Sequence, residues 1–270
     1  MSLLLQRIED FYDAVPRSGA RAESHGGLTL FVREGSGWPY YARPTRGSGA
    51  AGVDEVLEVR ERQRELGVPE AFEWLHDLAP WMAGAAEGAG LDVRLCPLLV
   101  LDADAAESAV ARDQAADVRV LTGDEDDLAT AESVAHLAFA AEPGSTASVA
   151  ERDALAVTQD EGRLGELRRQ LRDGTVARVA ALAAGVGPVS VGGYQHAMGV
   201  AEIVGVGTLP AFRRRGLGAA VTARLAELAV ERGLTTVFLS AADDAAARVY
   251  EGVGFRRIGT AGIAEPFPAG

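Results

Sequence analysis

The chain has 270 residues, which is enough for two domains of ordinary size or one large domain. Hydrophobic residues make up 48% and charged residues 24%, a composition typical of a soluble globular protein with a substantial core. The formal net charge of −13 argues against broad binding to nucleic acid or to an anionic membrane, and the single cysteine, Cys96, excludes an intramolecular disulfide.

The start of the chain lacks the features of a signal peptide. Residues 1–13 include Arg7, Glu9 and Asp10 but neither a long apolar core nor a small-residue cleavage site. No apolar run approaches the roughly 18 residues that a membrane-spanning helix needs. We therefore expect a cytoplasmic protein whose partners include neither nucleic acid nor a membrane.

The amino-terminal part of the chain divides into short predicted helices and strands. Apolar spacing predicts a helix over residues 3–14, strands over 28–32 and 38–42 with a turn at 34–37, and a helix over 53–66 that ends at Gly67. A second helix is expected from near Pro69, with Phe72 and Leu75 on one side, followed by a buried strand at 98–101. The polar, alanine-rich segment 102–116 is expected to connect two domains, 1–115 and 116–270.

The carboxy-terminal part has a more regular pattern. A strand at 118–121 precedes helices at 128–140, 147–158 and 164–172, and three strands follow at 176–183, 189–194 and 201–209. A helix, a strand, a helix and a last strand complete the chain. The four histidines, His25, His76, His136 and His196, are scattered without metal-ligand spacing, so no metal site is expected.

The strand at 201–209 contains two glycines that require an explanation. Strand alternation would place Gly205 and Gly207 on one face and the following residues on the other: Glu202, Val204, Val206 and Thr208. Glycines inside a strand weaken it, and the usual reason is a bulge or the close approach of a ligand or another backbone. A neighbouring helix that needs room is an equally good local explanation.

A basic, glycine-containing loop then opens a helix. It reads Arg213, Arg214, Arg215, Gly216, Leu217, Gly218, Ala219. Each arginine at the positive end of a helix dipole is unfavourable by roughly 0.3–1 kcal/mol, and a bound polyanion would reverse that sign. The alternative is a solvated basic turn. A nucleotide P-loop is disfavoured because no Lys-Ser or Lys-Thr follows, and a dinucleotide fingerprint because the three-glycine order is missing.

This loop, Arg-x-x-Gly-x-Gly after a strand and before a helix, resembles the coenzyme A pyrophosphate loop of the GNAT acetyltransferase superfamily. The downstream strand at 235–240 and the helix that follows Asp243, which reads DDAAARVYEGVGF, are similar to the family's Asn-x-x-Ala…Leu-Tyr-Glu-x-x-Gly-Phe ending. The resemblance covers residues 117–270 and implies an α+β fold with a mixed sheet. Asp243 departs from the usual asparagine and is expected only to cap its helix.

The resemblance implies a binding mode for acetyl-CoA as co-substrate. The strands at 201–209 and 235–240 should part, with pantetheine pairing with the backbone at Val206, Gly207 and Thr208. The diphosphate should lie on the loop whose members are Arg213, Arg214, Arg215, Gly216, Leu217, Gly218 and Ala219. Ser240 is a further candidate contact. No metal is implied.

Two residues are candidates for proton transfer. An amine attacks a thioester only when neutral, so a general base is useful, and Glu202 matches the glutamate of the histone-acetyltransferase branch by its spacing from Arg213. Tyr250 matches the family's helix tyrosine and would protonate the leaving thiolate. A solvated glutamate and a packing aromatic are the respective alternatives.

The implied activity is transfer of an acetyl group from acetyl-CoA to a primary amine of a small molecule or peptide, by direct attack in a ternary complex. The alternative is a non-catalytic acyl-CoA sensor or interaction module. The segment RQRELGVPEAFEW from Arg62 is similar to the leading half of two-part bacterial GNAT proteins, which is a degenerate copy of the catalytic fold. We expect no Arg/Gln-x-x-Gly-x-Gly/Ala loop in this half and therefore predict that it binds no coenzyme A by the usual route. It should complete the core and one wall of the acceptor site, or form a homodimer surface.

Overall fold

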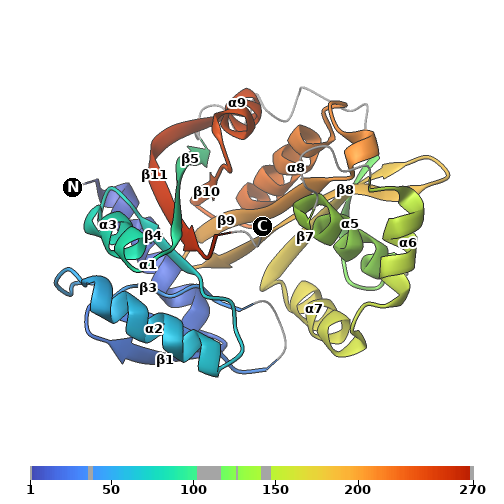
Figure 1. Ribbon diagram of the computed structural model, residues 1–270. Coiled ribbons are helices and arrows are strands. Elements are labelled where there is room, and N and C mark those ends of the chain that lie inside the picture. Colours follow the sequence, from blue (N-terminus) through green and yellow to red (C-terminus); the bar gives the residue numbers. More distant parts are fainter. Residues whose placement is uncertain (1, 36–38, 102–116, 126, 141–146, 268–270) are drawn as a thin grey trace. The chain divides into compact units, whose positions relative to one another are not determined.

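The computed structural model describes residues 2–35, 39–101, 117–125, 127–140 and 147–267 (Figure 1). The chain divides into two compact units that are interleaved in sequence. The first comprises Met1–Leu99, Ser240–Ala247 and Arg257–Gly270, and the second comprises Val100–Leu239 and Arg248–Arg256. The expected junction between residues 115 and 116 lies outside the described residues.

The first unit combines helices with short strands. Its elements are α1 (Leu3–Arg17), β1 (Ala20–His25), β2 (Leu28–Arg33), β3 (Arg43–Pro44), α2 (Val53–Glu65), β4 (Phe72–Leu75), α3 (Trp81–Gly88), β5 (Asp92–Leu101) and most of β11 (Phe255–Glu265). Strands β1, β2 and β3 form an antiparallel sheet, and β11 lies between β4 and β5. The predicted helices at the start of the chain and at 53–66 are confirmed.

Two predictions for this unit are wrong, and one strand was missed. Strand β1 was missed because its sequence, ARAESH, is polar and mostly exposed. Residues 39–41 form no strand, Ala42 makes only an isolated bridge to Phe72, and residue 38 lies outside the described residues. The run Phe72–Leu75 is a strand that pairs with β11, and the next helix begins only at Trp81. A short apolar run fits either structure, and here the paired backbone of β11 decides.

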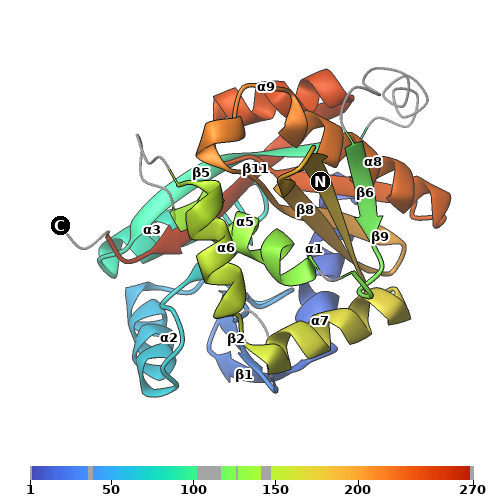
Figure 2. The same ribbon diagram turned by 90° about the vertical axis from the view of Figure 1, so that its right-hand side faces the viewer.

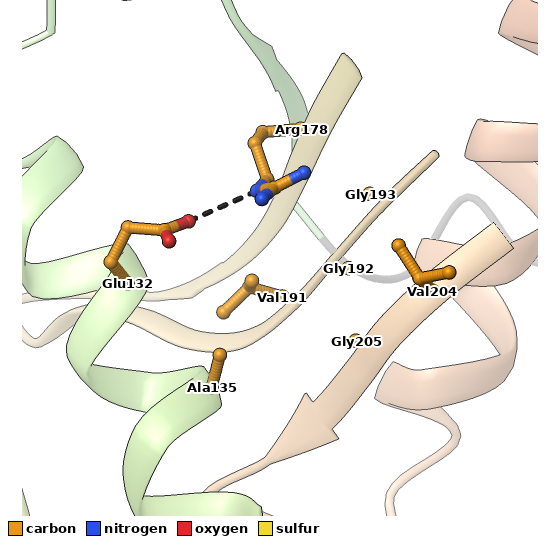
Figure 3. Close-up of a pocket in the computed structure, with 8 residues that line it drawn as sticks. All are labelled: Glu132, Ala135, Arg178, Val191, Gly192, Gly193, Val204 and Gly205. Atoms are coloured by element: carbon orange, nitrogen blue, oxygen red, sulfur yellow. Dashed lines mark hydrogen bonds and ion pairs between the residues drawn. The ribbon is translucent and has the colours of Figure 1, made fainter. Parts of the chain in front are cut away.

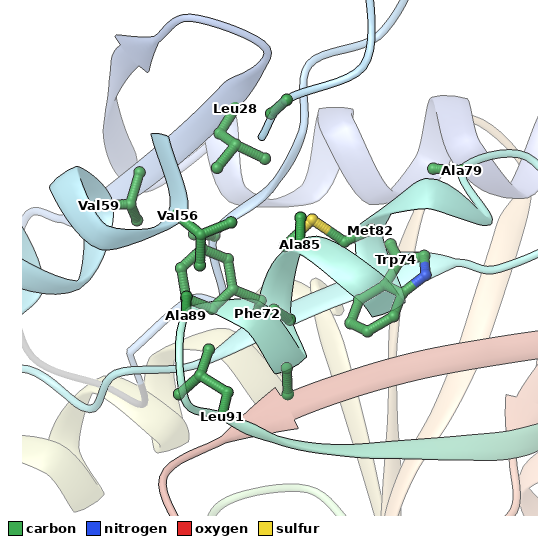
Figure 4. Close-up of a cluster of buried hydrophobic side chains, with 14 of the residues drawn as sticks. Leu28, Val56, Val59, Phe72, Trp74, Ala79, Met82, Ala85, Ala89 and Leu91 are labelled. Carbon is green, nitrogen blue, oxygen red and sulfur yellow. The ribbon is translucent and has the colours of Figure 1, made fainter. Parts of the chain in front are cut away.

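The core of the first unit is an apolar cluster between its helices and strands (Figure 4). Val56 and Val59 of α2 meet Phe72 and Trp74 of β4, and Met82 of α3 packs on the same group. All five side chains are at most 1% exposed. A cluster of this size explains why the unit is compact although its strands are short.

The second unit follows the predicted pattern closely. Its elements are β6 (Asp117–Leu121), α5 (Leu128–Ala140), α6 (Val149–Val157), α7 (Glu161–Asp173), β7 (Val176–Ala183), β8 (Gly187–Ala197), β9 (Val200–Thr208), the 3-10 turn η1 (Pro210–Phe212), α8 (Leu217–Glu231), β10 (Thr236–Ser240) and part of α9 (Asp244–Val253). The strand order is β10-β9-β8-β7-β6. Pairs from β6 to β9 are antiparallel, whereas β9 and β10 are parallel, so the fold is α+β with a mixed sheet as expected.

Helices cover both faces of the sheet in this unit (Figures 1 and 2). A Cβ added to Gly192 of β8 would lie 3.0 Å from Val221 and 3.1 Å from Leu225, so that position faces α8. A Cβ added to Gly207 of β9 would lie 2.7 Å from the Cβ of Ala138, so that position faces α5. In the part of the chain that the structure describes, no helix has the length and apolarity needed to cross a membrane.

Candidate functional site

The parallel strands β9 and β10 pair over only part of their lengths. Val200, Ala201 and Glu202 pair with Thr236, Val237 and Phe238. Strand β9 continues to Thr208, but none of its residues after Glu202 pairs with β10. The parting of these two strands, expected from the sequence, is therefore present, and it leaves part of one backbone edge of β9 without a strand partner.

Strand β9 contains a bulge at this point. Val191 and Gly193 of β8 pair with Gly207 and Val204 of β9, so two steps on β8 oppose three on β9. Gly205 has a φ of +65°, a left-handed conformation that favours glycine. The bulge therefore accounts for the glycine at position 205.

The bulge corrects the predicted facing of the strand residues. Val206 Cγ2 lies 3.0 Å from a Cβ built on Gly192, so Val206 faces α8, whereas Val204 lines a pocket with residues of α5. The prediction that Glu202, Val204, Val206 and Thr208 share one face is therefore wrong. Glu202 and Val204 face α5, and Val206 and Thr208 face α8. Gly207 has the other explanation that the sequence left open, room for the helix α5.

The arginine loop leads into a helix start that no side chain caps. Gly216 is the N-cap of α8, with a φ of +77°, and it makes no side-chain capping hydrogen bond. Gly218 lies beside the end of β9, because a Cβ added there would be 3.8 Å from Thr208 Oγ1. The first N–H groups of a helix have no partner within the helix, so this start can bind an external anion.

The three arginines of the loop have different roles. Arg213 donates hydrogen bonds to the carbonyl oxygens of Thr208, at 3.2 Å, and Ala138, at 3.3 Å, and so ties the loop to β9 and α5. Arg215 lies over the Phe212 ring, 4.9 Å from its centroid. Arg214 is exposed, and its guanidinium makes no hydrogen bond or ion pair to any described residue. Arg214 is thus the arginine most available to a ligand.

Glu202 is buried rather than solvated. Its side chain is at the last position where β9 pairs with β10, and the residue is 5% exposed. Gln195, directly opposite on β8, donates a hydrogen bond from Nε2 to Glu202 Oε2 at 3.0 Å. The carboxylate is therefore not solvated.

The remaining candidate residues lie near the carboxy-terminal helix. Tyr250 of α9 is half-buried, and burial raises the pKa of its phenol, so it remains protonated at neutral pH. Asp243 accepts a hydrogen bond from the Ala246 N–H at 2.7 Å, which confirms it as a helix cap. Ser240 ends β10 and is half-buried. Cys96 is 4% exposed, as expected of a core residue.

Sequence reasoning missed a charged pair in a pocket beside the bulge. Arg178 of β7 donates from Nε to Glu132 Oε1 of α5 at 3.0 Å, and both line a pocket with residues of β8 and β9, among them Gly193 and Gly205 (Figure 3). The available signals were an arginine inside the apolar strand VARVAALA and the adjacent glycines 192 and 193. Neither signal specifies a site without the fold.

A second loop with the same letter spacing was also missed. Arg46, Gly49 and Ala51 repeat the Arg-x-x-Gly-x-Ala pattern between β3 and α2 in the first unit. In α8 the first glycine of the pattern, Gly216, is the N-cap. In α2 the first glycine of the pattern is Gly49, but the N-cap is Gly52. Glu55 accepts hydrogen bonds from the N–H groups of Gly52, at 2.5 Å, and Gly27, at 3.4 Å. A carboxylate of the chain itself therefore occupies this helix start.

A metal site is not evident among the described residues. No group of three or more histidine, cysteine, aspartate or glutamate side chains within the described ranges could hold a metal ion. His196 forms a 2.7 Å hydrogen bond between Nε2 and the carbonyl oxygen of Gly174. This bond is an ordinary structural contact for a partly buried histidine.

Comparison with known proteins agrees with this geometry. Residues 191–262 match the family of FR47-like proteins. A GCN5-related N-acetyltransferase from Kribbella flavida has a similar structure, with a TM-score of 0.68 and 21% identity, and the match covers 100% of this chain and 97% of that one. A GCN5-related N-acetyltransferase-like protein from Streptococcus suis gives a TM-score of 0.58 at 12% identity, covering 97% of each chain. No curated protein matches the chain in sequence.

The two-part organisation also has a counterpart among solved structures. A tandem GNAT protein from the clavulanic acid biosynthesis pathway gives a TM-score of 0.53 at 16% identity, covering 90% of this chain and 79% of that one. The fold is therefore that of the GNAT acetyltransferases. The FR47-like match covers residues 191–262, which include the parted strands and the arginine loop.

Proposed function

We propose that the chain transfers an acetyl group from acetyl-CoA to a primary amine of a small molecule or peptide. One arrangement supports this proposal above all. The strands β9 and β10 part after Glu202, and the adjacent start of α8 is left without a side-chain cap. A long thiol arm and a diphosphate need a backbone edge and an anion site of this kind, side by side.

The residues present suit acetyl-CoA. The uncapped N–H groups at the start of α8, with Gly216, Gly218 and the unpaired guanidinium of Arg214, would hold the diphosphate. The backbone of β9 from Val206 to Thr208 would pair with the pantetheine arm, and Ser240 would be a further contact. Acetyl-CoA would supply the acetyl group as a thioester.

Two side chains of the chain would handle protons. Glu202, held by Gln195, would take a proton from the acceptor ammonium, so that the neutral nitrogen forms its bond to the acetyl carbon as the carbon–sulfur bond breaks. Tyr250 would give a proton to the departing sulfur, and the second proton that the nitrogen loses as it becomes an amide would restore the phenol. Burial raises the pKa of Tyr250 above its ordinary value, so this acid keeps its proton at neutral pH.

A thiol-release screen with acetyl-CoA against amines, aminoglycosides and peptide N-termini tests the proposal. Glu202→Gln should lower turnover and flatten the acidic limb of the rate–pH profile, whereas Glu161→Gln on the exposed start of α7 should change neither. Tyr250→Phe should lower turnover by more than about threefold. A smaller loss would make packing a sufficient role for Tyr250.

The alternative function is an acyl-CoA-binding module without catalysis. A rise in melting temperature with acetyl-CoA, but no thiol release with any amine of the panel, would favour it. The buried, hydrogen-bonded state of Glu202 supports the enzyme, because a module has no use for a proton acceptor at the parting of the strands.

A further inference from the structure

The pocket beside the β9 bulge contains a charge pair that packing alone does not require. Glu132 and Arg178 lie between α5 and the sheet, with side chains 10% and 23% exposed. Replacing a buried ion pair by apolar residues of similar size is often neutral or stabilising. Here the space is instead left as an open hollow of about 260 Å³, part of it solvent (Figure 3).

The arginine lies over a glycine of the neighbouring strand. Arg178 is paired across the strands with Gly193, and a Cβ added to Gly193 would overlap both its guanidinium and the backbone carbonyl oxygen of Ala177. A side chain at residue 193 would therefore block the position that the guanidinium takes over β8.

The arginine keeps hydrogen-bonding capacity that the protein does not use. Nε donates to Glu132, and Nη1 donates to the Ala177 carbonyl oxygen at 3.2 Å. Nη2 makes no hydrogen bond to any described residue. Glu132 also lies 3.9 Å from the Nη2 atom of Arg163, so two guanidinium groups accompany this one carboxylate.

The candidate base lies on the same face of the sheet, one step along it. The guanidinium of Arg178 lies over Gly193 of β8, and Gln195, the next residue on that face of β8, donates a hydrogen bond to Glu202. Same-face positions on a strand are about 7 Å apart. A small molecule that carries an amine and a carboxylate can span this distance when each group makes one hydrogen bond.

We propose that this pocket binds the carboxylate of the acceptor on Arg178, so that the enzyme acetylates amines of the amino-acid class. The inference rests on the proposed function and refines its acceptor. Glu132 orients the guanidinium through Nε, and the acceptor's carboxylate takes the unused Nη2 donor. The acceptor's ammonium group then faces Glu202.

Matched acceptors test this inference directly. We expect thiol release from acetyl-CoA to be at least about 10-fold more efficient, in kcat/KM, for free amino acids than for the corresponding amino-acid amides, which lack the carboxylate. Arg178→Gln should raise KM for the acids and leave the amides unchanged, thereby removing the preference. Arg119→Gln, which changes an exposed arginine of β6, should preserve it.

Two further variants separate binding from folding. Arg178→Lys keeps the charge and should retain part of the preference, whereas the double variant with Arg178→Gln and Glu132→Gln removes both charges, leaves neither buried alone, and should lose it. Equal use of acids and amides, or a preference that survives both the single and the double variant, would overturn the inference and leave the acetyltransferase proposal intact. Absence of turnover with both classes and with every other amine would overturn both.

Discussion

Each unit has a helix that follows a strand and a glycine-containing loop, and the two helix starts differ in what occupies them. At α2, the carboxylate of Glu55 binds the N–H groups of Gly52 and Gly27, and Gly26, with a φ of +56°, lets the β1–β2 turn close over it. At α8, the N-cap Gly216 has no such contact from any side chain that the structure describes. A helix start can recruit an external anion only where the chain does not supply one of its own.

The wider order of elements makes this comparison informative. The first unit runs β1-β2-β3-α2-β4-α3-β5, and the second unit's core runs β7-β8-β9-α8-β10-α9, with β11 next in the chain. Both series contain three strands, a helix, a strand, a helix and a strand. The order supports the interpretation of the first unit as a degenerate copy. In the first unit, the acidic residue at the third helical position, Glu55, binds the N–H group of the N-cap.

The largest expected effect comes from placing the same acid at α8. Glu55 is the third residue after the N-cap Gly52, and the matching position after the N-cap Gly216 is Ala219. Ala219→Glu should cap the helix from within and repel the diphosphate. We expect acetyl-CoA affinity, measured by calorimetry, to fall roughly 100-fold.

The neutral variant Ala219→Gln separates charge from size. It should weaken acetyl-CoA binding much less than Ala219→Glu does, because it caps without adding a charge. The melting temperature of the glutamate variant should be unchanged or higher, since an internal cap stabilises a helix start. If Ala219→Glu bound acetyl-CoA as tightly as the unaltered chain, the start of α8 would not be the diphosphate site.

A smaller effect is expected from the glycine at the helix start. Gly216 and Gly174 both cap helices in a left-handed conformation, at φ values of +77° and +73°. Alanine at either position should cost about 1 kcal/mol of unfolding free energy, as measured by denaturant titration. Gly216→Ala should in addition weaken acetyl-CoA binding roughly 10-fold by placing a methyl group at the anion site. Equal affinities in the two variants would contradict this assignment.

The second unit was largely predictable from the sequence, because its helices are amphipathic and its strands are apolar runs. In the helix from Leu217, the buried face includes Val221 and Leu225, and this spacing of apolar residues is the signal that carries most information. The loop before this helix was recognisable for a different reason, because its arginines conflict with the helix dipole unless an anion is present.

The facing of the site residues was not predictable. Strand alternation fails at Gly205, because a bulge adds one residue without changing the composition of the strand. The pair Arg178–Glu132 joins residues 46 positions apart, which only the fold brings together. The loop that begins at Arg46 shows that a sequence pattern alone can also mislead. The Arg-x-x-Gly-x-Ala spacing is present there, but Glu55 of the chain itself binds the N-cap of the helix that follows.

The smallest effect is expected at α2 itself. Glu55→Ala removes the internal carboxylate and should cost about 0.5–2 kcal/mol of unfolding free energy, in the range of other lost N-caps. Acetyl-CoA affinity and a stoichiometry of one per chain should be unchanged, because β3 spans only Arg43–Pro44 and offers no long backbone edge for the thiol arm.

The melting temperature of the same variant in sulfate gives the most specific test. An oxyanion that takes the place of the lost carboxylate should restore part of the melting temperature of Glu55→Ala, and should do so more than equal ionic strength of sodium chloride. The unaltered chain, whose α2 start is already filled, should show a smaller difference between the two salts. If sulfate stabilised both proteins equally, then Glu55 would not be acting as an internal substitute for an anion, and the contrast between the two helix starts would need another cause.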